Sequence, residues 1–482
     1  MNAQTASAQP PPPAQPAQPE TPSPAKPKQA LYFINAPVDM LWIGGLSIVT
    51  FLIIHYYYGN YDPRRDPGMR TATDPVVLWG QRLLWICNWP HFAATNYRLY
   101  HSRDNIKQYP LTALVIPWLV LAGVFGSVLY PTSIAPYFVL IFMLWSPYHF
   151  SGQTVGISLI YARRAGFTVG PLERLALSTF VFGTFLSTTI HSHVLGSSAP
   201  PSYFDIPVNS LGLPPVMYLL SEAAMYLAAV VLALLIIRWC IQNKRILPLI
   251  VLVPAVAQYV WFVGSNGWPS FIEFVPFFHS MQYLLIAWSM QLKEKVDMEQ
   301  AKPAAPRSTA GWALWGLATC GAAVAVLLNI PEHAEYRGVI QAVVVAAFVA
   351  YGFASTRLQS VGARPSKQYV LLETLRWWET NIFWGAALFW LFPMVLTRVW
   401  GVKELLALGV TAAAVQIHHF FVDGVIWKLK RKTVSSPLMV NIDELIHPAS
   451  ATAPAAMALP VISNVGAGMP VTQGAGSLGQ NV

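Results

Sequence analysis

The sequence predicts an all-α fold: a polytopic integral membrane helix bundle of about 12 transmembrane helices, with both termini in the cytoplasm. Three observations predict this fold. The 482 residues are 55% hydrophobic and only 11% charged, whereas a soluble domain carries about 25% charged residues. Apolar segments recur along the chain, each long enough to cross a hydrocarbon core about 30 Å thick. Lys and Arg are concentrated in the connections on one predicted side of the membrane.

Two tails flank the predicted transmembrane domain, which covers residues 31–432. Residues 1–30 are rich in Pro, Ala and Gln, a composition that predicts disorder. Residues 433–482 are rich in Ala, Gly, Ser and Val, and we expect them to be loosely ordered. The predicted spans are 38–58, 79–100, 111–130, 135–161, 172–193, 213–238, 246–264, 271–292, 311–330, 336–356, 378–398 and 404–429. The second span is the weakest, because its centre holds Asn88, Pro90 and Asn96.

The basic residues predict the orientation of these spans. With the N-terminus in the cytoplasm, all but seven of the 30 Lys and Arg residues fall on the cytoplasmic side, as the positive-inside rule requires. The net charge of +9 is spread over short loops and is not collected in one domain. This spread indicates a lipid bilayer as the partner and argues against a nucleic acid. We expect a multi-pass protein of the bacterial inner membrane.

Four spans share one layout, in which a histidine beside an aromatic residue is followed about fourteen residues later by basic residues. The histidines are His91, His149, His279 and the pair His418/His419. Fourteen helical residues cover roughly 21 Å, which is most of the membrane core. All four spans have even numbers in the predicted order and are therefore parallel, so the histidines share one depth in the outer half of the bilayer. Imidazoles inside a membrane mark functional sites by default.

Polar residues stand near these histidines, most of them at helical spacing. A charged side chain that faced lipid would cost about 2.5 kcal/mol or more, so we expect these residues to face the interior. Gln153, Gln282, Asp423 and Glu273 are predicted to orient the histidine rings, and Tyr283 is a candidate proton donor. Asp423 lies four residues after His419 and could supply a metal ligand or hydrogen-bond the imidazole; the second role is favoured.

The histidines predict a metal site with His91, His149, His279 and His419 as ligands and His418 as a substitute. Imidazole-rich sites suit iron, copper or zinc. The chain has three widely separated cysteines and no CxxC motif, so a thiolate cluster is not expected. Non-haem iron or copper is the first expectation for the cofactor, and haem with histidine axial ligands is the second.

Two segments, YHFSGQ and HHFFVDG, place an aromatic residue after the histidine and a polar residue about four positions on. In this they resemble the bacterial carotene-cleaving membrane oxygenases, which use histidines from several transmembrane helices to hold iron. The resemblance covers only these short segments and carries no residue roles. Twelve spans with metals in the outer half are also similar to the catalytic subunit of haem–copper oxidases. However, WSPYHF departs from that family's His-Pro-Glu-Val-Tyr pattern.

The sequence contains no Walker A motif and no HExxH motif, which argues against a nucleotide-driven engine and a zincin protease. Our leading hypothesis is a membrane metal-dependent oxidoreductase or oxygenase that acts on a hydrophobic substrate: a lipid, an isoprenoid or a carotenoid. Two alternatives stay open. One is a proton-coupled transporter that uses the histidines as a relay, and the other is a haem-binding membrane subunit.

Overall fold

The computed structural model describes residues 31–58, 76, 79–195, 202–265, 269–300 and 367–427. Within these ranges the secondary structure is helical, and extended pairing is limited to two isolated bridges at Val194–Leu213 and Tyr203–Ile206. The all-α prediction is therefore confirmed for the described part of the chain. The predicted spans 311–330 and 336–356 and both predicted tails lie outside the described residues.

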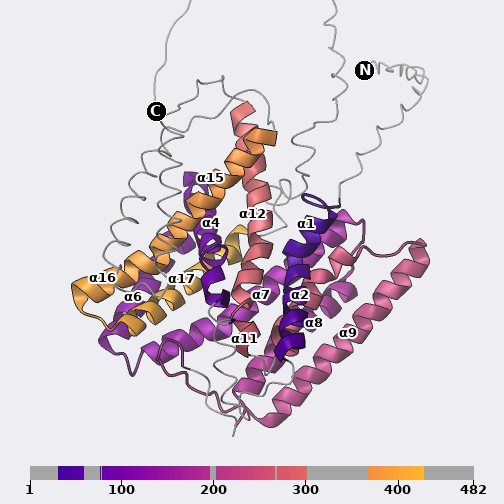
Figure 1. The fold of residues 1–482 in the computed structure, drawn as a ribbon. Coiled ribbons are helices and arrows are strands. Elements are labelled where there is room, and N and C mark those ends of the chain that lie inside the picture. Colours follow the sequence, from indigo (N-terminus) through magenta and orange to yellow (C-terminus); the bar gives the residue numbers. More distant parts are fainter. Residues whose placement is uncertain are drawn as a thin grey trace, which may run out of the picture.

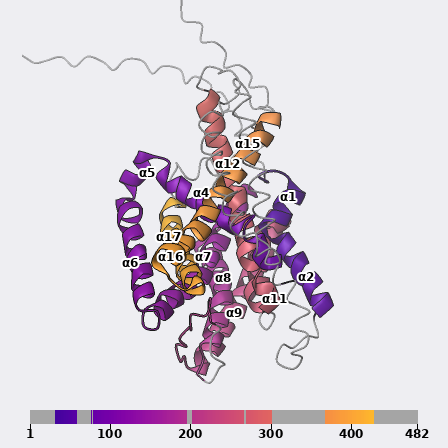
Figure 2. The same ribbon diagram turned by 60° about the vertical axis from the view of Figure 1, so that its left-hand side comes forward.

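The helices pack side by side as a bundle (Figures 1 and 2). In chain order they are α1 (Ala36–Met40), η1 (Leu41–Gly45), α2 (Leu46–Tyr58), α4 (Asn88–Tyr100), α5 (Arg103–Gln108), η2 (Leu111–Val115), α6 (Ile116–Leu129), α7 (Ala135–Arg164), α8 (Pro171–Ser192), α9 (Pro215–Asn243), η3 (Leu249–Val251), α10 (Val253–Tyr259), η4 (Val260–Gly264), α11 (Pro269–Ile272), α12 (Val275–Gln300), α15 (Lys367–Ala386), η6 (Ala387–Leu391), α16 (Phe392–Trp400) and α17 (Glu404–Ile426). Helical structure covers each predicted span that falls within the described ranges.

Five helical segments of the described chain are long and apolar enough to cross a membrane, as in a multi-pass membrane protein. They are Ala36–Tyr57, Leu111–Leu129, Pro215–Asn243, Glu373–Trp400 and Glu404–Ile426. Along α9 the outward side chains are apolar: Leu219, Leu227 and Leu234 are each at least 60% exposed. A surface of this kind suits contact with lipid. The count of twelve spans and the cytoplasmic termini go beyond this finding and stay predictions.

Two prolines shape the chain just before predicted metal ligands. The second predicted span is interrupted by a turn over residues 84–87, and α4 begins at Asn88. Pro90 is then in the first turn of α4, where its missing N–H costs no helical hydrogen bond. Pro147 lies inside α7, and the Ser151 hydroxyl donates to its carbonyl at 2.9 Å. These two prolines come two residues before His149 and one residue before His91.

The packing of four helices brings the predicted ligands together. α4 contacts both α12 and α17, and α17 also contacts α7. Each of these four helices carries one of the predicted ligands His91, His149, His279 and His419. Residues that are more than three hundred positions apart in the chain therefore meet in the interior of one bundle.

Candidate metal centre

Four imidazoles, each from a different helix, surround one point inside the bundle. The centroid of the His91 ring lies 4.5 Å from that of His419 and 5.1 Å from that of His279. The ring of His149 lies 4.7 Å from that of His419 and 5.2 Å from that of His279. His91, His279 and His419 are each only 1% exposed. The four predicted ligands thus form a ring in which three histidines are buried and the His149 side chain is 10% exposed.

Three of the four predicted ligands, together with Asp423, have nitrogen and oxygen atoms close enough for one ion; His279 is not in this set. One ligand atom each from His91, His149, His419 and Asp423 lies within 4.8 Å of all the others. The Nε2 atoms of His149 and His419 are 3.1 Å apart. Two ligands at about 2.0–2.2 Å from one ion are roughly 3.3 Å apart in a tetrahedron and at most about 4.4 Å apart. The set therefore needs only a small contraction to hold an ion.

Several ring nitrogens of this cluster have no hydrogen-bond partner among the described residues. They are Nε2 of His91, Nδ1 of His419 and both nitrogens of His279. Buried polar atoms in proteins almost always have a partner, and an exception indicates an additional group such as a water or an ion. The unpartnered nitrogens therefore point to a partner beyond the described residues, such as a water or a metal ion.

A hydrogen-bond chain fixes the ring of His91. The amide nitrogen of Asn88 can only donate, and it donates to the Ser280 hydroxyl oxygen at 3.2 Å and to the Pro276 carbonyl at 3.3 Å. The same hydroxyl lies 3.0 Å from Nδ1 of His91. With a proton on Nδ1, this contact leaves the Nε2 lone pair directed away from Ser280. Outer partners of this kind orient metal-binding histidines.

The Asp423 carboxylate is held with one oxygen toward the histidines. Trp427 Nε1 donates to Oδ1 at 3.1 Å. The other oxygen, Oδ2, lies 3.4 Å from Nε2 of His419 and 3.6 Å from Nε2 of His149. Both distances run to the same nitrogens that face each other across the cluster. This position places Oδ2 among the candidate ligand atoms, on the side where an ion would bind.

Tyr283, the candidate proton donor, lies directly against the cluster. Its ring stacks on that of His91 with centroids 3.9 Å apart. Its hydroxyl oxygen accepts a hydrogen bond from Thr95 at 2.6 Å, and both hydroxyls lie within hydrogen-bonding reach of Asp423. A tyrosine hydroxyl is thus connected to the carboxylate of the cluster through short polar contacts.

The two predicted glutamines support the helices around the cluster and do not hydrogen-bond the rings. Gln153 Nε2 donates to the backbone carbonyl of His279 at 2.9 Å and contacts Gln282 Oε1 at 3.4 Å. Gln282 in turn donates to the carbonyl of Ile43. The ring of His279 stacks on Phe150, with centroids 3.9 Å apart. The position of His279 is therefore set by its backbone and by an aromatic contact.

The structure does not bring His418 or Glu273 into the cluster. His418 Nε2 contacts the Tyr100 hydroxyl at 3.2 Å, on a different face of α17 from His419. Neighbouring residues on a helix point about 100° apart, so only one of the pair can face the centre. Glu273 lies between α11 and α12 and hydrogen-bonds Gln81.

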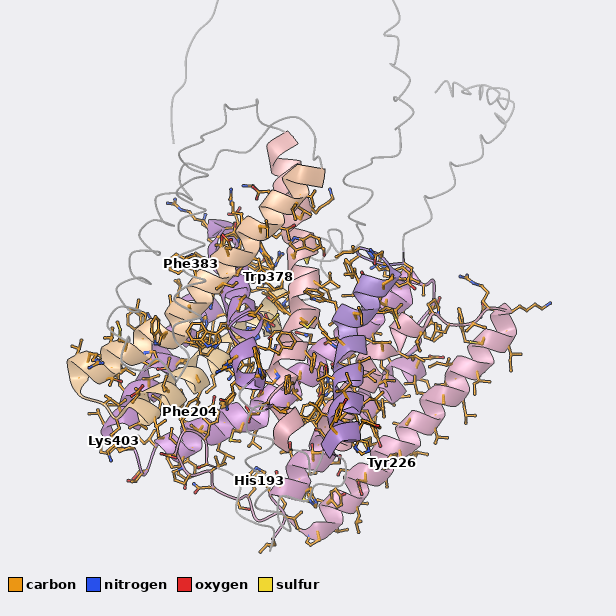
Figure 3. The ribbon with its side chains drawn as sticks, in the orientation of Figure 1. His193, Phe204, Tyr226, Trp378, Phe383 and Lys403 are labelled. Carbon is orange, nitrogen blue, oxygen red and sulfur yellow. The ribbon has the colours of Figure 1, made fainter. Side chains whose placement is uncertain are left out.

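His193 is a further buried histidine, and it lies away from the cluster. It is at the lower end of the bundle (Figure 3), where its Nδ1 accepts from the Leu211 N–H at 3.3 Å.

Four residues of the site were not predicted from the sequence: Asn88, Ser280, Thr95 and Trp427. Thr95 lies four residues after His91, and Trp427 lies four residues after Asp423. Helical spacing, applied to both of these residues, would have found them. Ser280 carries no such signal, because it contacts His91 across two helices.

Comparisons with known proteins give no relative for this chain: no protein-family model, no curated protein and no solved structure matches it.

Proposed function

We propose that the protein is a membrane metal-dependent oxidoreductase or oxygenase that acts on a hydrophobic substrate. The carrying observation is the convergence of four imidazoles from four helices in an apolar bundle, with unpartnered buried ring nitrogens. In this proposal His91, His149, His279 and His419 are ligands. Asp423 is a fifth candidate, because its Oδ2 lies near Nε2 of both His149 and His419.

The donor atoms favour non-haem iron or copper as the cofactor. Imidazole with a carboxylate and no thiolate suits these redox metals, whereas structural zinc sites usually contain cysteine. A haem with two histidine ligands needs its imidazoles on opposite sides of a flat macrocycle. Here the four rings contact one another at centroid distances of 4.5–5.2 Å, which favours a single ion. When bound, such a metal supplies Lewis-acid and redox chemistry.

The side chains around the cluster supply the remaining functions. Asn88 and Ser280 orient the His91 ring through the chain of hydrogen bonds to Nδ1. In the proposal, Tyr283 holds or moves a proton at its hydroxyl oxygen, which accepts from Thr95 and lies in reach of Asp423. The buried, largely apolar surroundings exclude bulk water from these groups.

The first experiment is purification in a mild detergent, with metal content and the visible spectrum measured on the same samples. We expect near-stoichiometric iron or copper in the wild type and its loss in His149→Ala. His191→Ala is the matched control, because His191 is exposed on α8, and it should keep the metal. A Soret band would instead support the haem-binding subunit.

Absence of metal in the wild type, even after reconstitution with iron and with copper, would contradict the proposal. The proton-coupled transporter would then be the better hypothesis. Its expected signature is transport in proteoliposomes that depends on pH and is lost in His149→Ala. His191→Ala serves as the control for that assay as well.

A further inference from the structure

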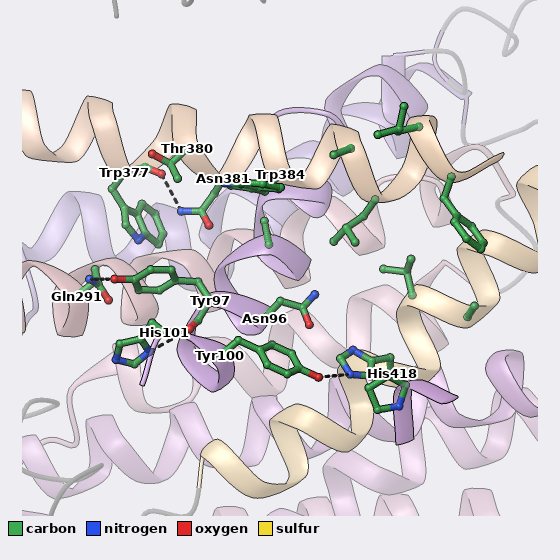
Figure 4. Close-up of a pocket in the computed structure, with 18 of the residues that line it drawn as sticks. Asn96, Tyr97, Tyr100, His101, Gln291, Trp377, Thr380, Asn381, Trp384 and His418 are labelled. Atoms are coloured by element: carbon green, nitrogen blue, oxygen red, sulfur yellow. Dashed lines mark hydrogen bonds between the residues drawn. The ribbon is translucent and has the colours of Figure 1, made fainter. Parts of the chain in front are cut away.

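A large cavity lies beside the histidine cluster. Its volume is about 1080 Å³, and its described walls come chiefly from α4, α6, α12, α15, η6, α16 and α17 (Figure 4). Ala93 and Asn96 line it from α4, directly after His91 and Phe92 in sequence. His418 lines it from α17, next to the predicted ligand His419. His418 is therefore part of the cavity wall, although it lies outside the histidine cluster.

The cavity is long and changes in character along its length. Between Glu373 and Leu388 it follows α15 and η6 for roughly 22 Å, at about 1.5 Å of rise per residue. Polar side chains such as Gln291 and Asn381 gather toward one end in Figure 4, and the side chains farthest from that end are hydrocarbon. Lys295 lines the cavity one turn after Gln291 on α12, and Arg376 and Glu373 line it before Asn381 on α15. The Arg376 guanidinium is paired with the Glu373 carboxylate, with Nη1 3.4 Å from Oε1, so this end carries one ion pair and the Lys295 ammonium. Val124 and Val395 also line the cavity.

One aromatic side chain separates the cavity from the cluster. Phe92 is only 3% exposed, and its ring lies 4.8 Å from that of His419 and 5.3 Å from that of His91. It packs in one cluster with Leu388 and Val415, which line the cavity, whereas Phe92 itself is not a lining residue. A chain in the cavity that reached the histidines by this route would therefore have to pass Leu388 or Val415 and then Phe92.

We propose that this cavity binds an amphipathic lipid with one long apolar chain and a small anionic head group, and that Phe92 is the partition between this chain and the metal centre. The head group would lie near Lys295 and Arg376, and the apolar chain would lie against Leu388 and Val415. The proposal that the chain reacts at the centre rests on the proposed function. Lipid binding in the cavity does not require a metal and can be tested separately.

The test is photo-crosslinking of the detergent-purified full chain with a long-chain fatty acid that carries a diazirine in the middle of its chain. Labelled peptides are mapped by mass spectrometry. We expect wild-type labelling on α4, η6 and α17, and about tenfold less labelling in Val415→Trp, which fills the apolar part. Leu119→Trp makes the same kind of change at a residue of α6 that is 61% exposed, and it should leave the labelling of these segments unchanged. Equal labelling in the two variants, or labelling spread over the outer surface, would overturn the proposal.

A second variant keeps the test decisive if Val415→Trp does not fold. Lys295→Gln should weaken labelling by the fatty acid about tenfold relative to labelling by the matching fatty alcohol, because only the acid carries a charge. Lys295 is chosen because the loss of Arg376 would also leave Glu373 without its ion-pair partner. Equal effects on both probes would overturn the anionic head group. Phe92→Ala should extend labelling to the α7 and α12 peptides that contain His149 and His279. Unchanged labelling there would show that Phe92 is not the partition.

Metal content is measured on the same samples, so the two proposals can fail separately. Labelling of the cavity in a wild type without metal would remove the oxidoreductase proposal and support lipid binding. Normal metal content with labelling outside the cavity would remove the lipid-binding proposal and support the oxidoreductase proposal.

Discussion

Two buried polar clusters of this bundle differ in how completely the chain satisfies them. Asp39 of α1 is fully buried, and its carboxylate accepts hydrogen bonds from the backbone N–H groups of Phe33 and Ile34 at 2.6 and 3.0 Å and from the Tyr161 hydroxyl at 2.7 Å. Three members of the four-histidine cluster are each only 1% exposed, yet four of the cluster's ring nitrogens have no partner among the described residues.

This difference separates a structural cluster from a candidate binding site. A closed set of hydrogen bonds, as around Asp39, ties the segment before α1 to α7 and leaves nothing for a ligand to bind. Buried ring nitrogens without a partner among the described residues are unfavourable in an apo-protein, and a metal ion bound by those that can face it would offset part of that cost. Four predictions test this contrast, and they are ordered from the largest expected effect to the smallest.

Replacing Asp39 by Ala should strongly destabilise the protein. The change would leave the buried Phe33 N–H and the Tyr161 hydroxyl without their acceptor, at about 1–3 kcal/mol each, and would also remove the acceptor of the partly buried Ile34 N–H. We expect a marked fall in the melting temperature in detergent, measured by intrinsic fluorescence, while folded protein keeps its metal content. Asp104→Ala is the control, because Asp104 is exposed on α5, and it should melt close to the wild type. A melting temperature equal to that of the control would show that the Asp39 contacts carry little stability.

Replacing His279 by Phe should have the opposite effects to those of Asp39→Ala: stability is kept and metal binding is lost. Phe keeps a ring to stack on Phe150 and removes two unpartnered nitrogens. Exchanging unsatisfied polar atoms for an apolar group of similar shape is nearly neutral or stabilising. We expect unchanged or higher thermal stability without metal, and metal affinity lower by more than about 100-fold because a ligand is lost. Metal titration followed by thermal melting measures both, and a His279→Phe protein that binds metal normally would remove His279 from the ligand set.

Replacing Ser280 by Ala should weaken metal binding by about 10–100-fold, the usual effect of losing an outer hydrogen-bond partner. Ser280 holds the ring of His91 through Nδ1, so the ligand would remain but lose its fixed orientation. Ser289→Ala on the same helix is the control, because that hydroxyl donates only to the Ile286 carbonyl one turn earlier. Equal metal affinities of the two variants would show that the Ser280 contact does not orient a ligand.

The helix positions were largely predictable from sequence, because long apolar runs bounded by polar residues require little knowledge of packing. The boundaries were less predictable. α15 is already helical at Lys367, the first described residue of this part of the chain and eleven residues before the expected start of that span at 378. Glu373 and Arg376 lie in this early part of α15. A prediction from hydropathy ends a span at such charged residues, although the backbone continues as a helix. For the turn before α4, the sequence predicts only that the helical span is weak around Pro90.

The four histidines could be grouped from sequence because each lies at about the same distance from a basic cluster, a pattern that predicts a shared depth in the membrane. Depth does not encode the direction of a side chain around its helix. Gln153 and Gln282 share the depth of the histidines but bond to the carbonyls of His279 and Ile43. Such contacts depend on how the helices rotate and pack against one another, and no spacing within one segment determines that rotation.

The pair His418/His419 provides the smallest expected effect and the sharpest test of that rotation. His419 is 1% exposed and faces His149, whereas His418 contacts Tyr100 and lines the cavity. We expect His418→Ala to change metal affinity by less than about threefold, or roughly 0.6 kcal/mol. His419→Ala, one position away in the same helix, should lose the metal. Because the two changes are chemically identical, a difference between their metal contents measures only which face of α17 each residue occupies. Metal loss in His418→Ala with retention in His419→Ala would mean that α17 is rotated by about 100° from the arrangement described.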